Sequence, residues 1–139
     1  MNPSMTRFDQ RFFASAPASV GLARDFVDKT LLAWGLDALA EDVRLCVSEL
    51  ATNAVVHANT YGSFLVRLAI DGRYLHLEVH DDHPRRPEVR VLTHDVTSGR
   101  GLRLVAALSV GWGVDALHPS GKIVWSRFHI VPALQETPC

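Results

Sequence analysis

The stretch VSELATNAVVHA, residues 47–58, combines a helical apolar period with three polar side chains at four-residue steps. Glu49, Asn53 and His57 fall on successive turns of a helix. A helix built only for packing would hold Leu, Ala, Lys or Gln at these positions, because a half-buried carboxylate or amide without partners costs free energy. The pattern therefore indicates a helix that contributes to a core and also carries a functional edge.

The helix around this stretch is expected to run from an N-cap at Asp37 to about Ala58, with Glu41 and Asp42 at the positive end of its dipole. On a 100° wheel, four apolar residues fall within about 60° of one another. They are Val43, Val47, Leu50 and Ala54. The three polar residues lie at about −120°, −80° and −40° from the first of them, along one edge of the buried face.

The residues before this helix predict a short strand and another helix. RFFAS, residues 11–15, has the composition of a strand, and Pro17 suits the first turn of a helix. That helix keeps a 3.6-residue apolar period and is expected to stop at Gly35. Its periodic residues are Val20, Ala23, Val27 and Leu31.

Residues 63–82 predict a β-hairpin with a tight turn at Asp71-Gly72. In its second strand Leu75, Leu77 and Val79 alternate with polar residues, and Asp81 falls in phase with the apolar set. A carboxylate in that phase points into the layer between sheet and helices. It could accept a hydrogen bond from an exocyclic amine, as a reader of adenine must; the alternative is a carboxylate that caps the following turn.

Residues 83–98 show no sustained period and predict a long irregular connection. Gly99 and Gly101 then precede an apolar helix expected to begin near Leu102, where backbone N–H groups could approach phosphates. The alternative is a plain turn before a helix. Two further strands, at residues 110–117 and 122–131, are expected to flank a turn at 118–121.

This order of elements predicts an α+β fold: a two-layer α/β sandwich in which a mixed, mostly antiparallel sheet carries helices on one face. The 139 residues, 47% of them hydrophobic, are expected to form a single domain, 1–139, with flexible tails at 1–9 and 132–139. The formal charge of −1 offers no field that would draw the chain to nucleic acid or to an anionic membrane. The two cysteines, Cys46 and Cys139, favour a reducing, cytoplasmic setting.

Three other interpretations stay open at this point. The column of Glu49, Asn53 and His57 also fits the polar edge of an ordinary amphipathic helix. Three histidines, His76, His80 and His83, lie close to Asp81 and Asp82 and invite a metal site, although the first two should face away from Asp81. A basic run, Arg85, Arg86 and Arg90, suits a protein-docking or lid surface better than a nucleic-acid site, since no aromatic residues interleave with it.

Taken together, VSELATNAVVHA, LEVHDD, SGRGLRLV and GKIVW resemble the GHKL ATP-binding domain shared by histidine kinases, Hsp90-type ATPases and bacterial anti-sigma-factor serine kinases. The resemblance covers residues 11–131 and is closest to the short, stand-alone anti-sigma kinases of actinomycetes. It implies ATP and Mg²⁺ as ligands. It also implies a sigma factor, an anti-sigma antagonist protein, or both, as partners.

The resemblance also implies roles for single residues. Asn53 matches the magnesium-binding asparagine, Glu49 the acidic residue that polarises the attacking hydroxyl or water, and Asp81 the reader of the adenine amino group. His57 is expected to help shape the site. The remaining nucleotide-binding positions are Gly99, Arg100, Gly101, Leu102 and Lys122.

The chain departs from the family pattern after Asp81, where glycines usually follow in the order D-x-G-x-G. His83 and Arg85 stand at those glycine positions. Thr97 and Ser98 stand where some of these kinases have an arginine, a role that Arg100 or Arg103 could take over. We therefore expect an ATP-dependent serine/threonine kinase acting as an anti-sigma factor. The alternative is a non-catalytic binding module, and a homodimer through the first helix stays open.

Overall fold

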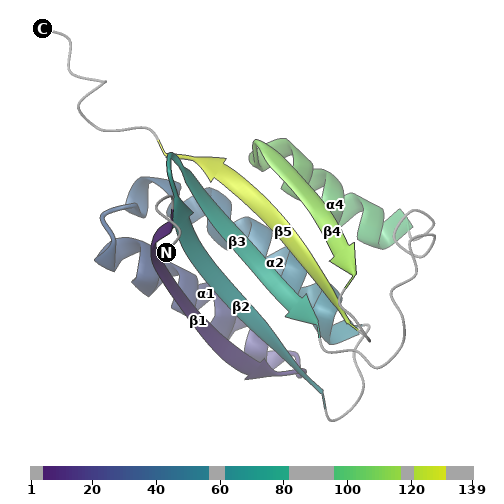
Figure 1. The fold of residues 1–139 in the computed structure, drawn as a ribbon. Coiled ribbons are helices and arrows are strands. Elements are labelled where there is room, and N and C mark those ends of the chain that lie inside the picture. The colour runs from purple at the N-terminus through teal and green to yellow at the C-terminus, as the bar shows by residue number, and fades with distance from the viewer. Residues whose placement is uncertain (1–4, 57–61, 82–95, 117–120, 131–139) are drawn as a thin grey trace, which may run out of the picture.

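The computed structural model describes residues 5–56, 62–81, 96–116 and 121–130 (Figure 1). The elements are β1 (Met5–Ala14), α1 (Ala18–Ala33), the 3-10 helix η1 (Asp37–Leu39), α2 (Ala40–Val56), β2 (Ser63–Asp71), β3 (Tyr74–Asp81), α4 (Val96–Leu108), β4 (Gly111–Ala116) and β5 (Lys122–His129). The expected tail at 132–139 lies outside the described residues.

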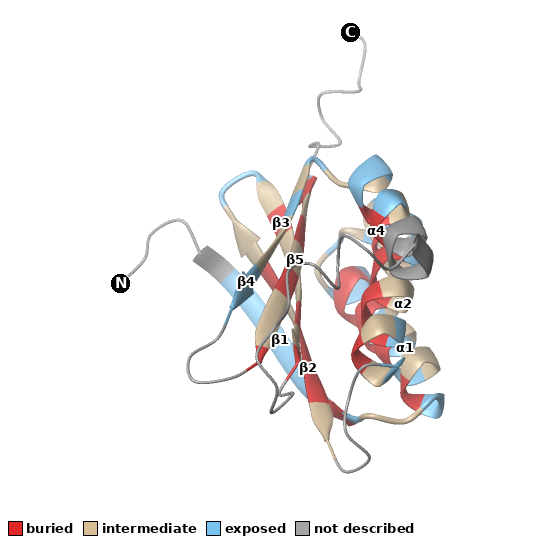
Figure 2. Cartoon of the chain, turned by 90° about the vertical axis from the view of Figure 1, so that its right-hand side faces the viewer, coloured by how far each residue is buried: buried red, intermediate tan, exposed pale blue. Residues whose placement is uncertain are grey.

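The strands form one sheet in the order β1-β2-β3-β5-β4, and every described pairing in it is antiparallel. Figure 2 shows α1, α2 and α4 on one face of this sheet. The predicted α+β two-layer sandwich is therefore confirmed. All four described strand pairings are antiparallel, so in the described part the sheet is antiparallel rather than mixed.

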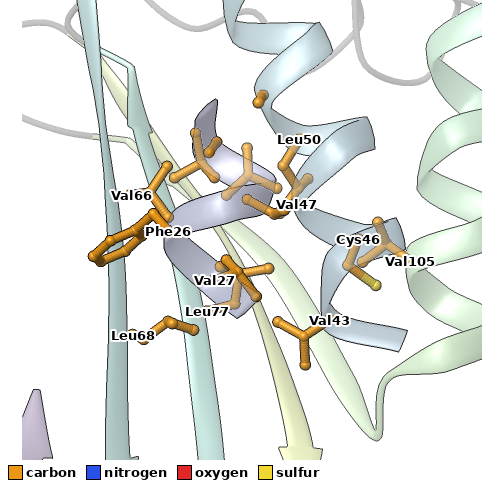
Figure 3. Close-up of a cluster of buried hydrophobic side chains, with 14 of the residues drawn as sticks. Phe26, Val27, Val43, Cys46, Val47, Leu50, Val66, Leu68, Leu77 and Val105 are labelled. Atoms are coloured by element: carbon orange, nitrogen blue, oxygen red, sulfur yellow. The ribbon is translucent and has the colours of Figure 1, made fainter. Parts of the chain in front are cut away.

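The core lies between the sheet and the helices (Figure 3). The predicted stripe of α2 is buried in full, as are Val27 and Leu31 of α1. The sheet contributes alternate residues of β2 and β3, among them Val66, Leu68 and Leu77. Each such side chain stabilises the fold by about 1.5–3 kcal/mol relative to an exposed one. The apolar faces of α1, α2 and the sheet thus pack together in a single layer.

The boundaries of the first predicted helix are confirmed, the start of the second needs a correction, and its predicted end near Ala58 lies outside the described residues. Pro17 is the N-cap of α1, and Gly35, at φ 73°, follows the end of that helix. The predicted N-cap at Asp37 is wrong, because Asp37 is the first residue of η1 and α2 begins at Ala40. The chain forms a 3-10 turn there, and the α-helix α2 begins directly after it.

The hairpin between β2 and β3 turns one residue later than predicted. Asp71 pairs with Tyr74, so the two loop residues are Gly72 and Arg73. Gly72 has φ 63°, and no described residue other than glycine has a positive φ. Glycine at the first loop position alone corresponds to a type II′ turn, whereas an Asp-Gly loop would be type I′.

Strand β1 is longer than the predicted strand at residues 11–15. It begins at Met5 and pairs with β2 from Met5↔Asp71 to Ala14↔Ser63, so residues 5–9 of the expected tail belong to the sheet. The sequence did not show the usual pattern of apolar residues on the covered face of a strand, because charged residues occupy the helix-covered face of β1. Arg11 stacks over the Phe26 ring at 5.5 Å, and Arg7 lies 5.9 Å from the centre of the Trp34 ring.

Candidate functional site

The functional edge of α2 faces α4. Figure 3 shows Cys46 of α2 beside Val105 of α4, and α2 contacts both α4 and β3. Glu49 follows Cys46 by three residues and Asn53 by seven, so both lie on the same side of the helix as Cys46. Both are half-buried. This matches the predicted position at one edge of the core stripe.

The pKa of the Cys46 thiol reflects the electrostatics of this edge of α2. Burial raises the pKa of Cys46 to about 12, and the negative charges of Asp42 and Glu49 add to the effect. The thiol therefore stays protonated at neutral pH, and Cys46 packs as a small apolar side chain. Glu49 brings a carboxylate charge close to the contact between α2 and α4.

Asp81 ends β3 on the helix-covered face, as its phase predicted. It is only 3% exposed, and it continues the buried row formed by Leu75, Leu77 and Val79. The register places it opposite Phe64 of β2 and opposite Lys122 of β5. Directly opposed residues point to the same face of a sheet. A buried carboxylate and a half-buried lysine thus share the helix side of the sheet at this end.

The predicted helix start near Leu102 is wrong. Helix α4 begins at Val96, so Gly99 lies in its first turn and Gly101 inside the helix. Leu102 is 5% exposed and belongs to the core, as does Val105 one turn later. Two glycines cost a helix about 1 kcal/mol each, which is why the sequence favoured a later start, but burial of this apolar face outweighs that cost.

The glycine-containing turn still belongs to the N-terminal part of α4. The backbone N–H groups of the first four residues of a helix have no intrahelical acceptor and can bind an anion. Figure 1 shows this end of α4 towards the same side of the molecule as the end of β3 and the start of β5. The side chain of Arg100 is not described, and His57, His83 and Arg85 lie outside the described residues.

The histidines of β3 lie on the open face of the sheet, as predicted, and thus away from Asp81. His80 Nε2 lies 2.7 Å from Glu78 Oε1, and His76 Nε2 lies 3.7 Å from Asp71 Oδ2. Across the described ranges, no group of three His, Cys, Asp or Glu side chains is arranged to hold a metal ion. The interpretation as a histidine metal site gains no support from this arrangement.

A pocket between β1 and α1 was missed by the sequence interpretation. Its volume is about 600 Å³, and it is lined by charged residues that include Asp9, Arg11, Asp25 and Lys29. The alternation of charges along residues 7–11 was the available signal. This pocket lies at the β1 edge of the sheet, beyond β2 as seen from Asp81, so it is separate from the site at α2 and β3.

None of the helices in the described part of the chain is both long and apolar enough to span a bilayer.

Comparison with known proteins places the chain in a domain family. A family model for the histidine kinase-like ATPase domain matches residues 13–128, from β1 to β5. The match includes Glu49, Asn53, Asp81 and Lys122 together with the glycines of α4. No curated protein matches the chain.

Proposed function

Because the chain belongs to the histidine kinase-like ATPase domain family and so to the ATP-binding proteins, we propose that it is an anti-sigma factor with serine/threonine kinase activity. Its substrate would be a serine or threonine of an anti-sigma antagonist protein, and its setting the cytoplasm. The observation that carries the proposal is the buried carboxylate of Asp81 at the end of an apolar row, on the face of the sheet that α2, the helix of Glu49 and Asn53, covers.

The surroundings of Asp81 suit an adenine base. The Asp81 carboxylate is 3% exposed, and a carboxylate oxygen accepts hydrogen bonds from amine donors. The exocyclic amine of adenine is such a donor, and Asp81 ends a strand row whose other buried members are apolar. A base without that amine would place a group that cannot donate a hydrogen bond next to the carboxylate. This loss is the physical basis of selection for adenine.

The polar edge of α2 suits the phosphate end of the nucleotide. The amide oxygen of Asn53 is a hard ligand, and Mg²⁺ takes only one or two protein ligands when phosphates and water complete its octahedron. When bound, Mg-ATP supplies the γ-phosphoryl group and the cation that offsets its charge. Within this arrangement we assign Glu49 to orient the hydroxyl of the protein substrate. Lys122 and the N–H groups of α4 are assigned to the phosphates.

The alternative function is a regulatory module of the same fold that binds a sigma factor without transferring phosphate. The specific feature in its favour is the sequence after β3, where His83 and Arg85 replace two glycines of the family pattern. A ring and a long cation restrict the backbone more than glycine does. The two functions differ in whether the γ-phosphoryl group leaves the nucleotide.

Calorimetric titration with Mg-ATP, followed by a γ-labelled ATP transfer assay with candidate antagonist proteins, tests the proposal. We expect saturable binding and label on the antagonist, with Glu49→Gln abolishing transfer but leaving nucleotide affinity within a few-fold. Binding without transfer to any antagonist would favour the regulatory module. The absence of Mg-ATP binding would reject the assigned site.

A further inference from the structure

Lys122 of β5 lies directly opposite Asp81 of β3. Directly opposed residues of neighbouring strands point to the same face of a sheet, with their Cβ atoms about 4.5–5.5 Å apart. Both side chains therefore leave the sheet on its helix-covered face, at the end where β3 stops and β5 begins (Figure 1). The strand register thus places a lysine beside the carboxylate that we assign to the base.

The opposed pair of Asp81 and Lys122 marks the place where the apolar layer of the sheet ends. The next opposed pair on this face is Val79 and Val124, which are 2% and 5% exposed. Asp81 is buried to a similar degree, whereas Lys122 is half-buried. A lysine in such a setting lays its hydrocarbon stem on apolar surface and holds its ammonium group at the polar end.

The backbone around Lys122 restricts where its side chain can go. Gly121, the residue before it, is buried and has φ 97°, a conformation that residues with a Cβ rarely adopt. On the other side of β5, Ala116 of β4 stands opposite Lys122. Alanine carries no polar group, so of the two residues opposite Lys122 only Asp81 offers an acceptor side chain. By position, Lys122 belongs with the residue proposed to read the base.

We propose that Lys122 reads the base together with Asp81 and lets the site accept purines that carry an oxygen at C6 as well as adenine, a role that rests on the nucleotide site proposed above. The register assigns Lys122 to the base, whereas its charge alone would assign it to the phosphates. Asp81 supplies a hydrogen-bond acceptor, and Lys122 supplies a donor. Together the two side chains match two different purine edges.

Adenine and guanine present opposite groups at C6. Adenine carries an amine donor there, next to the N7 acceptor, and guanine carries the O6 acceptor, again next to N7. With adenine, Asp81 accepts from the amine and Lys122 donates to N7. With guanine, Lys122 donates to O6 and N7, and Asp81 accepts from the ring N1–H. A site with the carboxylate alone would instead place O6 against a negative charge and would select adenine.

Inosine triphosphate separates these two kinds of site most sharply. Its base, hypoxanthine, has the O6 and the N1–H of guanine but no exocyclic amine. A site that reads only an amine should reject this base, since a buried polar group left without its partner costs affinity. A site in which Lys122 donates to O6 should bind it nearly as well as adenine.

Calorimetric titration with the Mg²⁺ complexes of ATP, GTP and inosine triphosphate tests the proposal. We expect the wild type to bind all three with affinities within about tenfold of one another. Lys122→Met keeps the length of the side chain but removes the donor, and it should weaken GTP and inosine triphosphate at least about tenfold more than ATP. Lys29→Met, at an exposed position of α1, is the matched control for the loss of one positive charge.

The possible results separate the role of Lys122 from the nucleotide site as a whole. Binding of ATP without GTP or inosine triphosphate would overturn the role of Lys122 and leave the nucleotide site in place. A loss in Lys122→Met that is equal for all three nucleotides, or no loss at all, would also overturn it. Absence of binding to all three would reject the site and the base assignment together. Circular dichroism checks that the variants are folded, and the wild-type comparison needs no variant.

Discussion

Asp81 is the residue at which strand phase and burial combine to mark a site. Its side chain belongs to the inward row of β3, where three apolar residues precede it, and it is 3% exposed. A buried carboxylate is retained in a core only when something compensates its lost hydration. The chain belongs to an ATPase domain family, and the adenine amine is the donor that we propose for this carboxylate. The proposed site rests on this residue more than on any other.

Asn53→Ala tests the proposed magnesium ligand. We expect the affinity for Mg-ATP to fall at least tenfold, which corresponds to about 1.4 kcal/mol or more, because the amide oxygen is lost. Alanine is the best helix former, so the free energy of unfolding should stay close to that of the wild type. Thr52→Ala, at an exposed position of the same helix, is the control for calorimetric titration. Unchanged affinity in Asn53→Ala would reject the assignment.

Ser126→Ala tests a polar atom in the core. Ser126 is 0% exposed, and its Oγ has no hydrogen-bond partner among the described residues. Removing an unsatisfied buried hydroxyl should raise the free energy of unfolding by about 1 kcal/mol, measured by denaturant titration. Ser48→Ala serves as the control: Ser48 Oγ accepts a hydrogen bond from Arg24 Nη1 at 3.3 Å, so its removal should give no gain. A loss of stability in Ser126→Ala would contradict the expectation.

At the scale of elements, the glycines of α4 and those of β4 differ in their surroundings. Those of α4 are helical residues, as described above, whereas Gly111 and Gly113 of β4 lie on the open face of the sheet next to β5 side chains. A Cβ on Gly113 would lie 2.7 Å from the Trp125 indole ring, and one on Gly111 would lie 3.4 Å from Arg127 Nη2. The absence of a side chain at Gly113 lets the Trp125 ring lie against the strand.

Gly113→Ala should therefore destabilise the fold. The new methyl group meets a rigid ring, and overpacking of this kind costs about 1–3 kcal/mol. Gly111→Ala is the matched control, because its neighbour is the far end of a flexible arginine, which can move aside. The difference between the two midpoints of urea unfolding measures the effect. Equal midpoints would show that the Trp125 ring shifts without cost.

At the scale of the molecule, the two faces of the sheet have different tasks. The helix-covered face holds the core (Figure 2) and the candidate nucleotide site, and the open face carries titratable residues of β3. On the open face, the hydrogen bond with His80 lowers the pKa of Glu78, and burial lowers the pKa of His76. Acid should therefore act on the fold through the open face.

The sign of the acid effect is the same for both groups. A lowered pKa of His76 disfavours the imidazolium in the folded state, so stability should fall as the pH drops below its ordinary value of 6.5. A lowered pKa of Glu78 favours the carboxylate in the folded state. Its contribution is full above its ordinary value of 4.5 and is lost as the pH falls through the lowered pKa.

Melting temperature measured against pH checks this expectation. The wild type should lose stability in two stages, His76→Gln should flatten the upper one, and Glu78→Gln should flatten the lower one. Each variant thus serves as the control for the other. A melting temperature that rises on acidification through either range would contradict the assigned directions.

The sequence alone determined the elements whose period is strong. The apolar stripe of α2, the inward phase of Asp81 and the two-layer α+β class follow from spacing, because a helix or strand must bury one face whatever it packs against. The resemblance to the GHKL family was legible in the same residues and agrees with the matching family model. Among the described residues, Asp37, the hairpin turn and the starts of β1 and α4 were misplaced, and the sheet is antiparallel rather than mixed.

Tertiary structure decided where β1 and α4 begin and which residues of other elements lie opposite them. Residues 5–9 carry too much charge to predict a strand, yet backbone pairing with β2 and the rings under Arg7 and Arg11 hold them in the sheet. The glycines of α4 are helical because Leu102 and Val105 are buried against the rest of the chain. Strand order, and with it the meeting of Asp81 and Lys122 and the exposure of the β1 edge, depends on contacts between residues distant in sequence. Local periodicity carries no information about such contacts.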